Sequence, residues 1–155
     1  MNTSKVISLI KKQGWCPVKY GHHPSHVKDA IRLSNFRPQA KQCFYNSQQL
    51  VIRQDEYNFL YVEGIVKSLI PIIHAWVIDE KGYHHDITLN PPPEIYRFKI
   101  YTKNEIINNM IKTKTFCPID ENWLNIMQHA AIIGISSEKT FEDVENEVKN
   151  IMMNR

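Results

Sequence analysis

The sequence has few cysteines and no long hydrophobic run, and both features limit the classes of protein it can belong to. Its three cysteines, Cys16, Cys43 and Cys117, form no CxxC pair. An odd cysteine count in a chain of 155 residues argues against a disulfide framework and predicts free thiols in a reducing compartment. No segment approaches the ~18 apolar residues of a membrane span, and residues 1–15 lack the features of a signal peptide. We therefore expect a cytoplasmic protein with no membrane partner.

The charge and the organisation of the chain exclude further classes. The net charge is only +3 and the lysines are scattered, so no basic stripe predicts a nucleic-acid partner. No repeat, low-complexity tract or linker divides the sequence. A chain of this length with 43% hydrophobic residues can bury one core. We predict a single domain over residues 1–155, and no feature indicates an oligomeric state.

Hydrophobic periodicity predicts helices at both ends of the chain and strands between them. Helices are predicted for residues 3–14, 24–35, 43–53, 102–112, 123–134 and 140–151. Strands are predicted for residues 58–66, 70–79, 82–88 and 94–101. Residues 16–23 and the prolines at 91–93 are predicted loops. Helices, then an antiparallel meander, then helices predict an α+β fold.

The segment PIIHAWVIDEKGYHHDIT, residues 71–88, predicts a hairpin that brings a histidine and a carboxylate together. A three-residue loop at 80–82 would use its glycine in the left-handed position and add a bulge. In that register the numbers of paired residues sum to 162, so His74 lies opposite Thr88 and diagonal to Asp86, on the same face. A two-residue loop would shift the register by one and place the two side chains on opposite faces.

Cys43 begins the helix predicted for residues 43–53, where a thiol becomes a better nucleophile. The unpaired N–H groups and the dipole at a helix start favour the thiolate. A nearby imidazole favours it further and can protonate a leaving group, and a carboxylate fixes the orientation of that imidazole. Cys43, His74 and Asp86 occur in this order, and we predict them to be the nucleophile, the general base and acid, and the orienting group.

These motifs carry a family resemblance. The matching segments are QCFYNS at 42–47, YVEG at 61–64, HAW at 74–76 and G-x-x-x-D-x-T at 82–88. Over about residues 40–90, the sequence resembles the core of transglutaminase-like cysteine enzymes, within the papain-like group. The resemblance implies a helix carrying the nucleophile, packed on a small antiparallel sheet and flanked by N- and C-terminal helices. It also implies the same three catalytic roles. Ile87 stands where a proline is common in that family, whereas Thr88 is retained.

Neighbouring residues are candidates for the oxyanion hole and for a cover over the imidazole. The backbone N–H of Cys43 is one oxyanion donor, and the side-chain amide of Gln42 is the favoured second donor, with Gln39 as the alternative. Trp76 lies on the strand face of His74, where it would either form a wall of the substrate pocket or shield the imidazole from water.

Two polar residues are further candidates for the substrate pocket. Glu63 falls in the middle of a predicted strand, where a charge needs a partner. It would either pair with a lysine or arginine or line the pocket beside His74. Asn46, in the same turn as Cys43, would contact substrate, cap the helix or face solvent.

Histidines and a carboxylate raise an alternative metal site. The histidines concerned are His22, His23, His26, His84 and His85. Adjacent strand residues point to opposite faces, so only one of His84 and His85 can join Asp86. The set matches no recognised ligand spacing. We therefore expect no metal and no other cofactor.

The leading hypothesis is thiol-dependent acyl transfer on an amide or on a protein or peptide substrate. Water as the acceptor would make the protein a peptidase, amidase or deamidase, and an amine acceptor would make it a transglutaminase. The alternative is a transglutaminase-like fold that binds a protein partner and leaves its triad unused.

Overall fold

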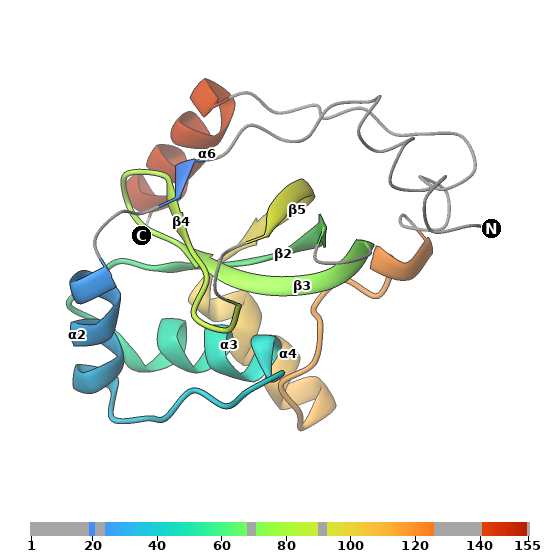
Figure 1. Cartoon of the computed structure of the whole chain (residues 1–155), viewed down its shortest axis with the longest axis horizontal. Helices are drawn as coiled ribbons and strands as arrows, with labels where there is room; N and C mark the ends of the chain where they lie inside the picture. The colour runs from blue at the N-terminus through green and yellow to red at the C-terminus, as the bar shows by residue number, and fades with distance from the viewer. Residues whose placement is uncertain (1–18, 21–23, 68–70, 90–92, 126–140, 155) are drawn as a thin grey trace.

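The computed structural model describes residues 19–20, 24–67, 71–89, 93–125 and 141–154 (Figure 1). Its elements, in chain order, are β1 (Lys19–Tyr20), α2 (Pro24–Ser34), α3 (Cys43–Arg53), β2 (Leu60–Lys67), β3 (Pro71–Ile78), β4 (Tyr83–His85), β5 (Glu94–Tyr101), α4 (Lys103–Thr113) and α6 (Phe141–Met153). The strands form one sheet in the order β1-β4-β3-β2-β5. The α+β class is confirmed. The helix predicted for residues 3–14 and most of that predicted for 123–134 lie outside the described residues.

Helices cover both faces of the sheet, with α3 and α4 on one side and α6 on the other (Figure 1). On the α3 side the buried cluster contains Val27, Ala30, Cys43, Leu50, Val51, Phe59, Tyr61, Ala75, Val77, Tyr101 and Ile106. On the α6 side it contains Leu60, Val62, Val66, Trp76, Ile78, Ile95, Phe98 and Val148. Covering both faces explains why β2 and β3 are apolar almost throughout rather than alternating with polar residues.

Strand β2 pairs antiparallel with both β3 and β5, and one glycine allows their close approach. Gly64 of β2 pairs with His74 of β3 and with Phe98 of β5. A Cβ atom at Gly64 would lie 2.1 Å from the carbonyl oxygen of Arg97. The position therefore requires glycine because the neighbouring backbone occupies the space of a side chain.

The hairpin between β3 and β4 has the predicted register. Val77 pairs with His85 and Ile78 with His84, so the paired numbers sum to 162. Gly82 has φ of 87° and donates its N–H to the carbonyl of Asp79, which closes the three-residue loop. The sequence prediction of the loop is confirmed.

One strand prediction and one loop prediction need correction. The strand predicted for residues 82–88 ends at His85, because the Asp86 carboxylate accepts the N–H groups of Thr88 and Leu89 and turns the chain out of the sheet. The predicted loop at 16–23 contains β1, which pairs in parallel with β4. A two-residue strand held by a distant partner has no local sequence signal.

The helix α4 begins after a threonine N-cap. Thr102 accepts the N–H of Glu105, and its hydroxyl donates to the Glu105 carboxylate. Among the described helices, none is both long and apolar enough to cross a bilayer.

Candidate functional site

The structure brings His74 and Asp86 into contact across the hairpin. Nε2 of His74 donates to Oδ2 of Asp86 at 2.6 Å, and the two side chains are only 3% and 2% exposed. Pairing between β3 and β4 stops at Val77, three residues after His74, and the chain turns away at Asp86. That departure places the carboxylate beside the ring. Because Asp86 occupies Nε2, Nδ1 is the nitrogen left to meet the thiol.

Cys43 is the other partner of the His74 ring. Burial lowers the pKa of His74, but hydrogen bonds to Asp86 and to Cys43, with the charges of both groups, raise it to about 9. With a pKa of about 9, the His74 ring keeps its proton at neutral pH. The three predicted catalytic residues lie together, and Asp86 and Cys43 contact the same imidazole.

Cys43 lies at the start of α3, at the edge of a hydrophobic cluster. It is a free thiol, as predicted, and 9% of the residue remains exposed. The four residues before it, 39–42, are all exposed. Cys43 therefore lies next to an exposed segment of the chain.

The loop before Cys43 holds a residue in an unusual backbone conformation. Lys41 has φ of 63°, in the left-handed region that a residue with a Cβ occupies at a cost of about 1–2 kcal/mol. The N–H of Gln42 donates to the carbonyl of Gln39 and closes the turn around it. Strain of this kind is retained where the surrounding contacts fix the backbone, and it occurs often at functional sites. No sequence signal indicated it.

The predicted oxyanion donor Gln42 occupies the N-cap position of α3. Its carbonyl accepts the N–H of Asn46 at 2.8 Å, while its side chain makes no capping hydrogen bond. The side chain is exposed, next to Cys43 in sequence. Its role as an oxyanion donor stays a prediction.

Asn46 joins two loops. Its Oδ1 accepts the N–H of Gln39 at 2.8 Å, and its Nδ2 donates to the carbonyl of Gln39 at 2.8 Å and to Oγ1 of Thr88 at 3.0 Å. Both N–H donors are used within the protein and the residue is 1% exposed. Asn46 therefore links the Cys43 loop to the Asp86 turn instead of offering donors to a substrate.

Trp76 shields the imidazole. Its ring stacks on His74 with centroids 5.9 Å apart, and it is 1% exposed. Its Nε1 donates to Nδ1 of His84 at 2.6 Å. Burial lowers the pKa of His84 to about 3, so this ring is neutral and its proton is on Nε2. Of the two predicted roles, shielding fits this geometry, because a buried indole forms no open pocket wall.

Glu63 is fully buried, and neither predicted role describes it. Its carboxylate accepts hydrogen bonds from four donors: the Tyr61 hydroxyl, the N–H groups of Ile119 and Asp120, and Nε1 of Trp123. None of these donors is a lysine or arginine. Burial raises the pKa of Glu63, although these hydrogen bonds oppose the shift. Glu63 pairs with Ala75, so its side chain lies on the opposite face from His74.

The histidines of the predicted alternative metal site have other partners. His84 accepts from Trp76, and Nε2 of His85 donates to Asp79 at 2.8 Å. Within the described ranges, no group of three or more histidine, cysteine, aspartate or glutamate side chains is arranged to hold a metal ion. His22, His23 and the side chain of His26 fall outside what the structure describes.

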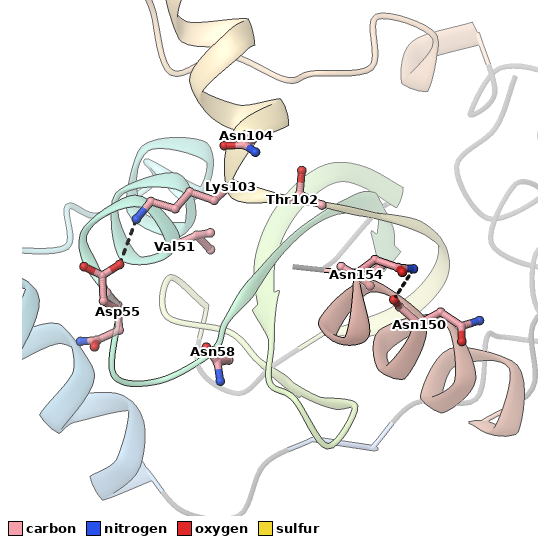
Figure 2. A pocket seen from close by; sticks show the side chains of 10 residues that line it. Val51, Asp55, Asn58, Thr102, Lys103, Asn104, Asn150 and Asn154 are labelled. Atoms are coloured by element: carbon pink, nitrogen blue, oxygen red, sulfur yellow. Dashed lines mark hydrogen bonds and ion pairs between the residues drawn. The ribbon is translucent and has the colours of Figure 1, made fainter.

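A cavity of about 620 Å³ lies at the other end of α3 from Cys43 (Figure 2). It is lined by Val51, Gln54, Asp55, Asn58, Thr102, Lys103, Asn104, Asn150, Ile151 and Asn154. Val51 is eight residues after Cys43, about 12 Å along the helix axis. The cavity is therefore separate from the His74–Asp86 pair.

Comparison of the chain with protein-family models, with curated proteins and with solved structures finds no match.

Proposed function

We propose that the protein is a thiol-dependent acyl-transfer enzyme that uses Cys43, His74 and Asp86 as its catalytic triad. The observation that carries the proposal is the His74 imidazole, which is bound to Asp86 at 2.6 Å and whose pKa is raised by both Asp86 and the neighbouring Cys43. A thiol, an imidazole and a carboxylate in this order are the parts that amide cleavage through a thioester requires. The substrate is an amide in a protein or peptide.

The proposed fold is a transglutaminase-like core of the papain-like group. Three features support it: a cysteine as the first residue of a helix, an antiparallel sheet under that helix, and a histidine and an aspartate contributed by the two arms of one hairpin. Each corresponds to a segment of the sequence resemblance over residues 40–90.

In the first half of the proposed reaction, the Cys43 thiolate attacks the carbonyl carbon of the amide. The backbone N–H at the start of α3, with Gln42 as second donor, stabilises the oxyanion. His74 then gives its proton to the leaving amine as the C–N bond breaks, which leaves a thioester and a neutral imidazole.

In the second half, the neutral imidazole takes a proton from the acceptor as that acceptor attacks the thioester, and the thiolate leaves. Water gives hydrolysis or deamidation, and an amine gives transamidation. Every step is a proton transfer or a nucleophilic attack among the side chains, the substrate and the acceptor, so the reaction needs no cofactor.

The alternative function is binding of a protein partner by a catalytically unused triad. The narrow exposure of Cys43, 9%, is the observation that favours it. Under this alternative Cys43 would be inert toward small electrophiles, whereas the enzyme proposal requires a reactive sulfur.

Selective alkylation separates the two functions. At pH 7, iodoacetamide is expected to label Cys43 at least tenfold faster than Cys117, because an adjacent imidazole activates a cysteine nucleophile. Cys117 is a demanding comparison, since hydrogen bonds with Thr115, Thr113 and Asn109 lower its own pKa. The rates are measured by mass spectrometry of the two cysteine-containing peptides.

His74→Gln is expected to remove the preference for Cys43. The matched control is His85→Gln, which breaks a second histidine–carboxylate pair, that of His85 and Asp79, on the same hairpin. The control should keep the labelling preference. Equal or negligible labelling of Cys43 in the wild-type protein would reject the enzyme in favour of the binding module.

A further inference from the structure

We propose that Asn46 is a positioning residue, which locks the Cys43 helix to the Asp86 turn through its hydrogen bonds to Gln39 and Thr88. The inference rests on the proposed function and extends it from the three reacting groups to the contact that keeps them in register. Asn46 lies three residues after Cys43, about one helical turn, and is 1% exposed.

The first arm of the contact fixes the loop that leads into Cys43. The Asn46 amide both accepts from the N–H and donates to the carbonyl of Gln39, each at 2.8 Å. A two-point contact of this kind fixes the orientation of the Gln39 peptide as well as its distance. Residues 39–42 contain the left-handed Lys41 and the candidate oxyanion donor Gln42. The same side chain therefore holds the nucleophile and the loop beside it.

The second arm reaches the group that orients His74. Nδ2 of Asn46 donates to Oγ1 of Thr88 at 3.0 Å. The backbone N–H of Thr88 donates to Oδ1 of Asp86 at 2.9 Å, and Oδ2 of Asp86 accepts from His74 at 2.6 Å. Thr88 thus contacts Asn46 through its side chain and Asp86 through its backbone N–H.

Together the two arms close a circuit of contacts. From Cys43 it runs along α3 to Asn46, across to Thr88 and through Asp86 to His74, whose pKa the Cys43 thiol raises. Asp86 belongs to a turn outside β4, so the sheet pairing does not hold it in place. The Asn46–Thr88 bond is a direct tie between that turn and the nucleophile helix, which makes it a determinant of the spacing between Cys43 and His74.

Thr88 offers a cleaner test than Asn46. Replacing Asn46 removes three hydrogen bonds at once and leaves Gln39 unsatisfied, so that variant risks unfolding. Thr88→Val has nearly the same shape and removes only the hydroxyl, while the backbone bond to Asp86 remains. Thr88→Ser restores the hydroxyl. Thr102→Val is the matched control, since it removes a threonine hydroxyl that caps α4 beside the distant cavity of Figure 2.

The experiment measures the rate of Cys43 alkylation by iodoacetamide from pH 5 to 10, in the full chain, with thermal unfolding of each variant recorded alongside. Thr88→Val is expected to lower the rate of Cys43 alkylation at pH 6–7 about tenfold. It is also expected to move the inflection at higher pH, which reports loss of the His74 proton, toward lower pH. Thr88→Ser and Thr102→Val are expected to keep the wild-type profile. A general loss of stability would move the melting temperature without moving the inflection.

Two results would overturn the inference alone: a wild-type profile in Thr88→Val, or the same altered profile in Thr102→Val. A wild-type protein whose Cys43 shows no enhanced reactivity at pH 6–7 is a different result. It rejects the proposed function, and the inference with it. The wild-type profile distinguishes failure of the inference from failure of the proposed function, because it is measured without any substitution.

Discussion

At the scale of single residues, the site is built from buried polar side chains whose partners come from other elements. Asn46, Glu63 and His74 are each no more than 2% exposed. Asn46 and Glu63 each make several hydrogen bonds, some of them with backbone groups of loops, and His74 donates to Asp86. Burying such groups is tolerable only while every partner is present, so replacing any of them has consequences beyond its own position.

Glu63 gives the sharpest stability prediction at this scale. Each of its carboxylate oxygens accepts two hydrogen bonds, so Glu63→Gln forces an amide NH₂ against two donors. We expect a loss on the order of 3 kcal/mol in the free energy of unfolding, measured by urea denaturation. Glu56→Gln, at an exposed position, should change it by less than about 0.5 kcal/mol. Equal midpoints for the two variants would contradict the buried network.

The sequence predicted the residues of the site better than it predicted their partners. The contact of His74 with Asp86 followed from the glycine in the loop, because that glycine sets the register of the whole hairpin. The partners of Glu63 are backbone N–H groups of Ile119 and Asp120, and backbone groups have no residue-specific signal. For that reason the sequence suggested a cation partner that the structure does not use.

At the scale of elements, local signals were sufficient where contacts are local. Helix α3 has its predicted bounds because Cys43 to Arg53 repeats apolar residues at helical spacing. Strand β4 was predicted too long, since an alternating pattern gives no sign that the Asp86 side chain captures the next two N–H groups. The turn that ends this strand also places Asp86 next to His74.

Gly64 provides the element-scale prediction. A methyl group there would meet the backbone of β5, so Gly64→Ala must push β5 away from β2. We expect a loss of about 3 kcal/mol or more in the free energy of unfolding. Gly82→Ala, where the cost is the positive φ alone, should lose about 1–2 kcal/mol. Denaturation curves for both variants give the ranking, and a smaller loss at Gly64 would show that β5 can move without cost.

At the scale of the whole molecule, the sheet separates two hydrophobic clusters, and the proposed triad draws on elements from both sides. Cys43 belongs to the cluster under α3, whereas Trp76, which stacks on His74, belongs to the cluster under α6. The α+β class and the order of helices and strands could be predicted from periodicity. The assignment of each helix to a face could not, because it depends on packing between segments distant in sequence.

The protonation state of His74 tests the central claim most directly, because a ring held between Asp86 and Cys43 keeps its proton well above neutral pH and loses part of that stabilisation without the thiol. The measurement is an NMR titration of the His74 ring signals in the wild-type protein and in Cys43→Ser. Burial favours the neutral ring, and both partners favour the charged one, so we predict a pKa of about 9 in the wild-type protein and a lower value in the variant. A value near 6.5 in both proteins would mean that the thiol and the imidazole do not interact, and would contradict the proposed triad.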